Sequence, residues 1–226
     1  GNREGLVQQG AGTWSLGHVR LAILDLSAAG AQPMANAAGN VWVTYNGEVY
    51  NYLELAEQLQ QRGHQFRSRS DTEVLLAAYE EWGDECVSRF RGMFSFVLVD
   101  LRRRRALMAR DRLGIKPIYL WFAANRLYVV SELKQLLSVD EFQPKLQAEQ
   151  AVDYLSEGLL GHEPHLTMFE SVVPLLPGSR LAWDLDQLPR PEQAVTYWEP
   201  SRQEVDCSWA EAVERVEDVF CQAVRL

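Results

Sequence analysis

Three consecutive residues, Asn46, Gly47 and Glu48, have the types and spacing needed for chemistry on a carbonyl group. They follow an alternating apolar run over residues 41–45, which predicts a half-buried strand that stops at Asn46 and Gly47. Asn46 brings an amide donor, Gly47 brings a backbone N–H that no side chain shields, and Glu48 adds a carboxylate. Two neutral donors at the end of a rigid strand suit an oxyanion hole, which stabilises charge that develops in a transition state.

On spacing alone, Asn-Gly between alternating residues favours a two-residue type I′ hairpin turn. The residues that follow favour a helix. Asn51 and Glu54 have the form of an N-cap and its capping-box partner, and Gly63 stands where a C′ residue is expected. Apolar residues recur between them at helical spacing: Tyr52, Leu55, Ala56 and Leu59. We therefore predict a strand, a short corner at Asn-Gly-Glu, and then a helix.

Two more charged residues are candidates for binding a ligand. Arg20 lies in an apolar run over residues 13–27. It is either a surface charge on a strand or a guanidinium held in place to bind a carboxylate. Asp71 follows Ser70, which with Glu73 fits a capping box at the start of a helix over residues 70–83. That helix start does not require Asp71, whose carboxylate remains available for an ammonium group.

The middle of the chain predicts antiparallel meanders. Apolar runs over residues 93–100, 106–110, 118–122 and 126–130 read as strands, and short helices are predicted over residues 84–91, 132–137 and 147–157. The connection over residues 110–119 contains two Arg, an Asp, a Gly and a Lys-Pro, which is elaborate for a turn. It is either a long salt-bridged hairpin loop or a segment with a role of its own.

Composition excludes several classes of function. The formal net charge of −9 and the pI of about 5.0 argue against nucleic acid or an anionic membrane as the main partner, and no apolar run approaches the ~18 residues of a membrane helix. Three widely spaced cysteines suggest a reducing compartment, and Cys86 is expected to pack inward. His162 and His165 flank a proline and are better explained by a polar loop than by a metal site.

The last part of the chain changes character. Residues 159–200 hold most of the prolines and predict loops with one strand near residues 179–183. Ser208 and Glu211 then cap a helix with an apolar stripe at Ala212, Val213, Val216, Val219, Phe220 and Val224. We predict a main domain over residues 1–184, a linker over 185–207, and the first helix of a second domain over 208–226.

Several motifs together carry a resemblance that covers nearly the whole chain. They are, in order, LGHVRLAILDLS, AQPM, YNGEVYNYLEL, RGHQFRSRSDTEVLLAAYEEWG, RGMFSFVLVD, RDRLGIKPIYL, VVSELKQLL, LTMFESVVPLLPGSRL and the Tyr-Trp pair at 197–198. The chain resembles the glutamine amidotransferase half of glutamine-hydrolysing asparagine synthetases, which are class II amidotransferases of the N-terminal-nucleophile hydrolase superfamily. This resemblance implies an α+β fold, a four-layer αββα sandwich of two antiparallel sheets.

The resemblance also implies residue roles. Arg20 matches the residue that grips the glutamine α-carboxylate, with an adjoining substrate-binding strand at Leu21, Ala22, Ile23 and Leu24. Asn46 and Gly47 match the oxyanion hole, and Glu48 and Asp71 match the acids near the α-amino group. The loop that holds Arg110, Asp111, Gly114, Lys116 and Pro117 matches the region that faces the synthetase domain and the ammonia route. No metal ligand is implied.

One departure from the family is large. The family nucleophile is an N-terminal cysteine, whereas residue 1 is glycine here and no cysteine precedes Cys86. The chain also stops before any Ser-Gly-Gly-x-Asp-Ser loop. We interpret it as a fragment cut at both ends, inactive without its nucleophile; the alternative is a natural protein that has lost the nucleophile.

The resemblance predicts the glutaminase half of an asparagine synthetase. Its expected partners are glutamine, the C-terminal synthetase domain of the same polypeptide and a second copy of the protein in a homodimer. No cofactor is expected in this chain, while ATP and Mg²⁺ are implied for the missing domain. A cytoplasmic location is expected, with no nucleic-acid or membrane partner. Two alternatives stay open: the same two-domain design acting on a sugar or cell-envelope acceptor, and a catalytically dead glutamine-binding domain.

Overall fold

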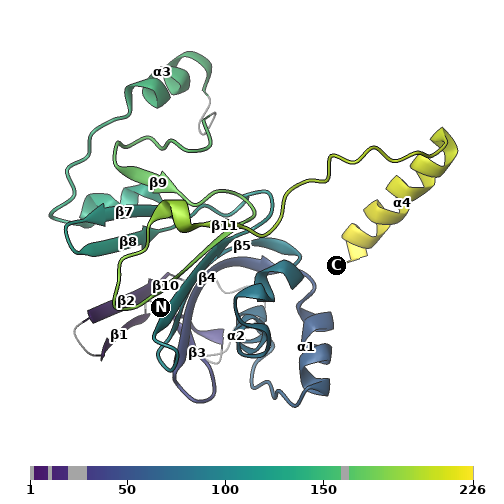
Figure 1. Ribbon diagram of the computed structural model, residues 1–226, viewed down its shortest axis with the longest axis horizontal. Coiled ribbons are helices and arrows are strands. Elements are labelled where there is room, and N and C mark those ends of the chain that lie inside the picture. Colours follow the sequence, from purple (N-terminus) through teal and green to yellow (C-terminus); the bar gives the residue numbers. More distant parts are fainter. Residues whose placement is uncertain (1–2, 10–11, 20–29, 159–162, 226) are drawn as a thin grey trace.

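A six-stranded antiparallel sheet forms the centre of the structure (Figure 1). The structure is a computed structural model, and it describes residues 3–9, 12–19, 30–158 and 163–225. Its strands follow the order β11-β10-β6-β5-β4-β3. Their bounds are β3 (Met34–Ala35), β4 (Val41–Val49), β5 (Gly92–Asp100), β6 (Arg105–Arg110), β10 (Ser179–Asp184) and β11 (Val195–Thr196). The long β4–β5 and β5–β6 pairs come from the most apolar runs of the sequence.

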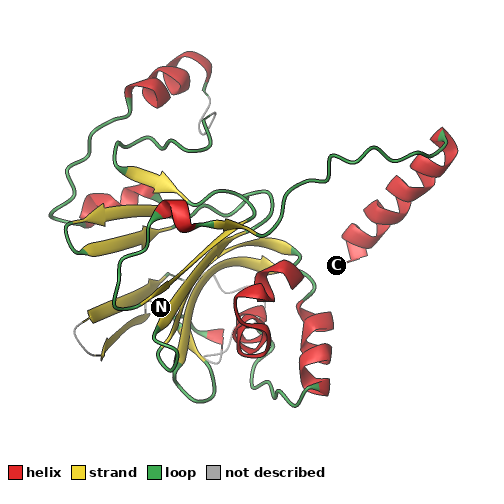
Figure 2. Ribbon diagram, in the orientation of Figure 1, coloured by secondary structure: helices red, strands yellow, loops and turns green. Residues whose placement is uncertain are grey.

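Two helices cover one face of this sheet (Figure 2). They are α1 (Tyr52–Gln61) and α2 (Asp71–Trp82), followed by a 3₁₀ helix, η2 (Gly83–Arg89). Because side chains alternate along a strand, Val41, Val43 and Tyr45 of β4 point into the core beneath the helices. Cys86 of η2 is fully buried in the same core, which confirms that it packs inward.

Two smaller sheets pack on the other face of the central sheet. One pairs β1 (Arg3–Gln9) with β2 (Gly12–His18), and the other has the order β8-β7-β9. The bounds of the latter are β7 (Tyr119–Ala123), β8 (Arg126–Val130) and β9 (Val172–Pro174). Leu120 of β7 packs with Met108 of β6, and Leu16 of β2 packs with Ala106 of β6, so both small sheets lie in one layer.

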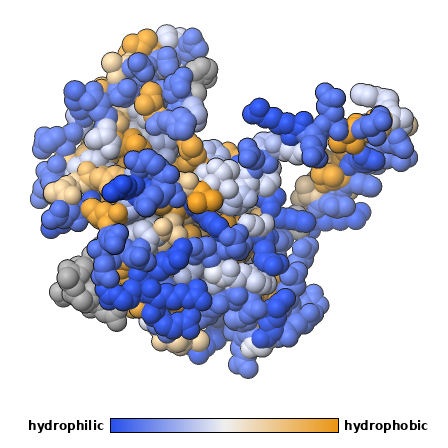
Figure 3. All heavy atoms as spheres, viewed as in Figure 1, coloured by the Kyte–Doolittle hydropathy of each residue, from blue (hydrophilic) through white to orange (hydrophobic). Residues whose placement is uncertain are grey.

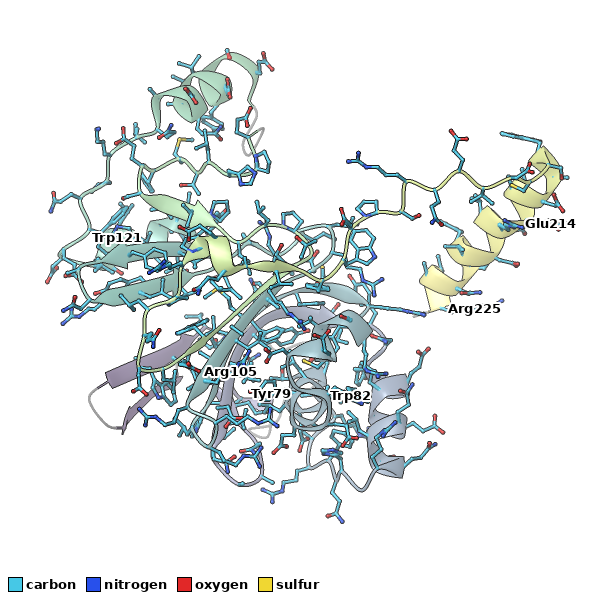
Figure 4. The ribbon with its side chains drawn as sticks, viewed as in Figure 1. Tyr79, Trp82, Arg105, Trp121, Glu214 and Arg225 are labelled. Atoms are coloured by element: carbon cyan, nitrogen blue, oxygen red, sulfur yellow. The ribbon has the colours of Figure 1, made fainter. Side chains whose placement is uncertain are left out.

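A 3₁₀ helix, η3 (Leu133–Ser138), forms the outermost layer. Along β7, Leu120 and Phe122 face the central sheet, whereas Trp121 faces outward and packs with Leu136 of η3. Figure 4 labels Trp121 in this outer core and Tyr79 of α2 in the core on the other side of the central sheet. The order helices, sheet, sheets, helix confirms the predicted four-layer αββα sandwich, with a second layer divided between two sheets.

The remaining elements lie at the edges of the sandwich. These are α3 (Ala148–Glu157), η4 (Pro191–Gln193) and α4 (Trp209–Arg225). β11 and Tyr197 attach part of the predicted linker to the sandwich, because β11 pairs with β10 and the Tyr197 hydroxyl donates to the Arg110 carbonyl oxygen at 2.8 Å. The division of the chain into domains stays a prediction.

α4 extends away from the sandwich at the end of an exposed segment (Figure 1). None of its described residues is buried, and Glu214 and Arg225 project from it (Figure 4). Apolar side chains remain exposed along it, among its charged residues (Figure 3): Trp209, Val213, Val216, Val219, Phe220 and Val224. The amphipathic helix predicted over this segment is confirmed, and its apolar stripe has no cover in this chain's described residues.

Candidate functional site

β4 runs straight through the Asn-Gly-Glu motif. Its register with β5 is continuous from Val41 to Val49, with Gly47 opposite Phe94. The predicted corner at Asn-Gly-Glu is therefore wrong, because the strand continues to Val49. The alternative of a hairpin turn at Asn46 and Gly47 is wrong as well. The reason is the close approach of β5, because Gly47 has φ +141° and a Cβ built on it would lie 2.0 Å from the Met93 carbonyl oxygen. Only glycine lets the two strands stay this close.

The outer edge of β4 is held by side chains beyond the point where β3 ends. β3 pairs only as far along β4 as Val43. After that, the Tyr45 N–H donates to Gln32 Oε1 at 2.7 Å, and the Val49 N–H donates to Asp71 Oδ2 at 3.0 Å. Alternate backbone N–H groups of a strand point to the same edge, so the Gly47 N–H points there too, between the other two.

The partner strand supports this orientation of Gly47. Phe94 lies directly opposite Gly47, and both of its backbone polar groups bond to Asp111. Its carbonyl oxygen accepts from the Asp111 N–H at 2.7 Å, and its N–H donates to Asp111 Oδ2 at 3.2 Å. Gly47 and Phe94 therefore form a pair without mutual hydrogen bonds. This pairing leaves the Gly47 N–H facing the outer edge of β4, and an oxyanion hole needs a donor of this kind.

Asn46 and Glu48 lie on the face of β4 that looks toward the small sheets, opposite Tyr45 and Val49. Both are half-buried. Two residues earlier on this face, Thr44 Oγ1 donates to the Gly17 carbonyl oxygen at 3.2 Å and lies 3.4 Å from His18 Nδ1. The end of β2 therefore runs beside the strand that carries Asn46.

The predicted carboxylate-binding residue follows directly after this contact in the chain. Arg20, Leu21, Ala22, Ile23 and Leu24 lie outside the described residues, so their predicted roles stay predictions. The described chain reaches Val19, one residue beyond His18. The contact between Thr44 and β2 thus brings the sequence that leads to Arg20 alongside β4.

Asp71 is buried and bound to β4. It is the first residue of α2, and its Oδ2 accepts from the Tyr45 hydroxyl at 2.6 Å as well as from the Val49 N–H. The sequence did not reveal these two protein partners, and the predicted role of Asp71 in binding an ammonium group stays a prediction. Burial, followed by the charge of Asp71, raises the pKa of Tyr45 well above its usual value, so the hydroxyl remains a donor.

The predicted helix caps are only partly confirmed. Ser70 Oγ accepts from the Thr72 N–H at 3.2 Å and caps α2 as predicted, but Glu73 turns away to bind the N–H groups of Arg67 and Ser68. Asn51 stands at the N-cap of α1 as predicted, but the capping box with Glu54 is wrong, because the Asn51 side chain makes no cap hydrogen bond. Its buried amide instead donates to the Arg89 carbonyl oxygen and accepts from the Arg91 N–H, which fixes the start of α1 against the connection between η2 and β5.

The loop from Arg110 to Pro117 crosses from the central sheet to the small sheet, since β6 and β7 belong to different sheets. The salt-bridged hairpin alternative is therefore wrong. The buried Asp111 carboxylate accepts four backbone N–H groups: those of Phe94, Leu113, Ile115 and Lys116. Asp111 thus acts as the centre on which the loop folds.

Arg110 ties the same loop to its surroundings. Its guanidinium donates to the carbonyl oxygens of Gly114, Lys116 and Leu175 at 2.7, 3.0 and 2.8 Å, and burial lowers its pKa. The Ser95 hydroxyl donates to the Pro117 carbonyl oxygen at 3.0 Å. The loop is therefore internally fixed, and it presents exposed apolar side chains at Leu113 and Ile115.

Comparison with known proteins gives the family. The model of the glutamine amidotransferase domain family matches residues 2–198, which include β4, Asp71 and the loop at 110–117. This chain belongs to the glutamine amidotransferase domain family. This chain is 35% identical over 214 residues to asparagine synthetase [glutamine-hydrolyzing] 3 of Bacillus subtilis (strain 168), covering 92% of this chain and 33% of the relative.

Other relatives and structures extend this picture. Amidase chry2 of Gibberella zeae is 35% identical over 215 residues, covering 93% of this chain and 31% of that protein. The solved structure of B. subtilis glutamine phosphoribosylpyrophosphate amidotransferase, complexed with ADP and GMP, superposes with a TM-score of 0.58 at 18% identity, covering 82% of this chain and 35% of that one. This likeness shows the shared fold. The chain spans about a third of the length of the curated relatives it matches.

None of the three cysteines of the sequence is placed as a nucleophile of the matched region. Cys86 is fully buried, and burial raises the pKa of its thiol strongly. Cys207 and Cys221 lie beyond the matched region, on the exposed segment and on α4. Within the described ranges, no group of three or more His, Cys, Asp or Glu residues could hold a metal ion. The helices of the described residues include none long and apolar enough to cross a membrane.

Proposed function

We propose that this domain binds L-glutamine and releases ammonia from its side-chain amide, as the glutaminase half of an asparagine synthetase. The observation that carries the proposal is the match of the amidotransferase family to residues 2–198. The edge of β4 supports it, because a fixed Gly47 N–H and the Asn46 amide are suited to bind an oxyanion.

The two ends of the substrate bind complementary charges in this proposal. Arg20, with Leu21, Ala22, Ile23 and Leu24 beside it, holds the α-carboxylate, while Asp71 and Glu48 hold the α-ammonium group. Asp71 already accepts two hydrogen bonds on Oδ2, but both donors are neutral, so its negative charge is not cancelled. A carboxylate has about four acceptor positions, which leaves capacity for an ammonium group.

The reaction needs a nucleophile, and no cysteine precedes Cys86 in this sequence. In our proposal a cysteine ahead of residue 1 attacks the amide carbon, ammonia leaves, and water cleaves the glutamyl thioester. Asn46 and Gly47 stabilise the oxyanion in both steps. The domain itself needs no metal or cofactor for this chemistry.

The rest of the activity belongs to a longer polypeptide. We propose that a synthetase domain follows residue 226, uses ATP and Mg²⁺, and transfers the ammonia to aspartate in the cytoplasm, in a protein that forms homodimers. The similarity to amidase chry2 favours a second candidate, the same design with another acceptor. Assaying the longer polypeptide with aspartate and with sugar acceptors, under ATP and glutamine, distinguishes the two.

The role of Arg20 provides the direct test of glutamine binding. In the longer polypeptide, Arg20→Ala should raise the glutamine KM by roughly 10- to 150-fold, the equivalent of losing a charge-assisted hydrogen bond. Synthesis from free ammonia should be unchanged, because it bypasses the glutamine site. Arg102→Ala, at an exposed arginine outside the site, is the matched control. Equal loss of glutamine-dependent and ammonia-dependent synthesis would show that Arg20 is structural.

We further propose that the Arg110 to Pro117 loop and the apolar stripe of α4 face the synthetase domain. Without that domain, the 226-residue chain should associate at micromolar concentrations in analytical ultracentrifugation. Replacing Val216 and Phe220 with Glu should reduce this association, whereas Glu at Arg215 and Gln222, on the opposite face of the helix, should not. A monomeric wild-type chain would contradict the proposal.

A further inference from the structure

The hydrogen bonds around Asp71 indicate that Tyr45 does more than pack in the core. Tyr45 is buried on the helix-side face of β4, and its hydroxyl donates to Asp71 Oδ2 at 2.6 Å. The Val49 N–H donates to the same oxygen at 3.0 Å. Two donors on one oxygen, 26 and 22 residues away from Asp71 along the chain, fix both the position and the rotation of this carboxylate.

Gln32 forms a second link between β4 and the start of α2. Its Oε1 accepts from the Tyr45 N–H at 2.7 Å, and its amide nitrogen lies 3.5 Å from Thr72 Oγ1, one residue after Asp71. The start of α2 is thus tied to the edge of β4 on both sides of Gly47. A shift of Asp71 would therefore also disturb the edge that carries the Gly47 N–H.

We propose that Tyr45 is a positioning residue for the glutamine site: its hydroxyl orients the Asp71 carboxylate toward the α-ammonium group of the substrate. The inference rests on the proposed function. Tyr45 lies within the core, so it acts on the substrate through Asp71. Because its pKa is raised, the hydroxyl donates throughout the neutral and mildly alkaline range. Tyr45 thereby contributes to selecting amino acids over simple carboxylic amides.

The test is Tyr45→Phe in the longer polypeptide, since it removes one hydroxyl and keeps the ring in the core. The KM for glutamine should rise about tenfold with little change in kcat, because a hydrogen bond to a charged group is lost. Tyr79→Phe is the matched control. Tyr79 is also buried and also donates to a buried carboxylate, Asp100, at 3.3 Å, but on the far part of α2.

A second probe separates positioning from general damage. Glutaramate is glutamine without its α-amino group, so it offers Asp71 nothing to bind. Its inhibition constant should be the same in wild type and Tyr45→Phe, although the glutamine KM differs. A rise in both constants, or a glutamine KM equal to that of Tyr79→Phe, would overturn the inference. A wild-type enzyme that releases no ammonia from glutamine would instead overturn the proposed function, and the inference with it.

Discussion

The 226-residue chain alone should release no ammonia from glutamine, and joining a cysteine-first segment ahead of residue 1 should create that activity. An oxyanion hole lowers a barrier only when a nucleophile attacks, and attack requires a thiolate held about 3 Å from the amide carbon. Gly1 offers only an amine, Thr13 and Ser15 are internal, and Cys86 is fully buried. Ammonia release is measured before and after the segment is added.

In the activated form, Asn46→Ala should lower kcat by about 10²- to 10³-fold with a small change in KM, which is the usual cost of losing an oxyanion-hole donor. Asn125→Ala, at an exposed amide in the turn between β7 and β8, is the control. A Cys→Ala change in the added segment should abolish the activity. Glutamine turnover by the unmodified chain, lost in Cys86→Ala, would contradict both the mechanism and the role of Asn46.

The sequence predicts the layers of the sandwich well, because alternation and helical spacing report directly on burial. Strands β5 to β8 and helices α1 and α2 fall where their apolar patterns indicate. Periodicity failed at β4, where Asn46 and Gly47 have the composition of a turn but lie within a paired strand. Pairing with β5 along the whole length of β4 outweighs the turn preference of these two residues, and Gly47 permits the close approach of the two strands.

The site itself could be identified from sequence only in part. Asn46, Glu48 and Asp71 are signalled by their types and by the resemblance, but the bonds from Tyr45 and Gln32 that organise them join segments far apart in the chain. Tyr45 looks like an ordinary strand residue, and Gln32 looks like part of a loop. The four N–H groups on Asp111 were equally hidden, because the sequence suggested salt bridges there.

Gly47→Ala should strongly destabilise the central sheet, although it adds only one methyl group. An L residue rarely adopts φ +141°, and the new Cβ would lie 2.0 Å from the Met93 carbonyl oxygen and 2.7 Å from the Phe94 Cα. Both contacts are with the backbone of the neighbouring strand β5, so no side chain can move aside to relieve them. We expect the free energy of unfolding to fall by about 3 kcal/mol or more, through strain and lost strand pairing.

The same change should abolish glutamine hydrolysis in the activated form, because separating β4 from β5 displaces the Gly47 N–H from its place between the bonds to Gln32 and Asp71. Urea denaturation and ammonia release measure the two effects. Gly17→Ala is the control: a Cβ there meets nothing within 4 Å, and Gly17 lies on β2 next to the same strand. If Gly47→Ala matches this control in both stability and turnover, the close approach of β4 and β5 is not what requires glycine.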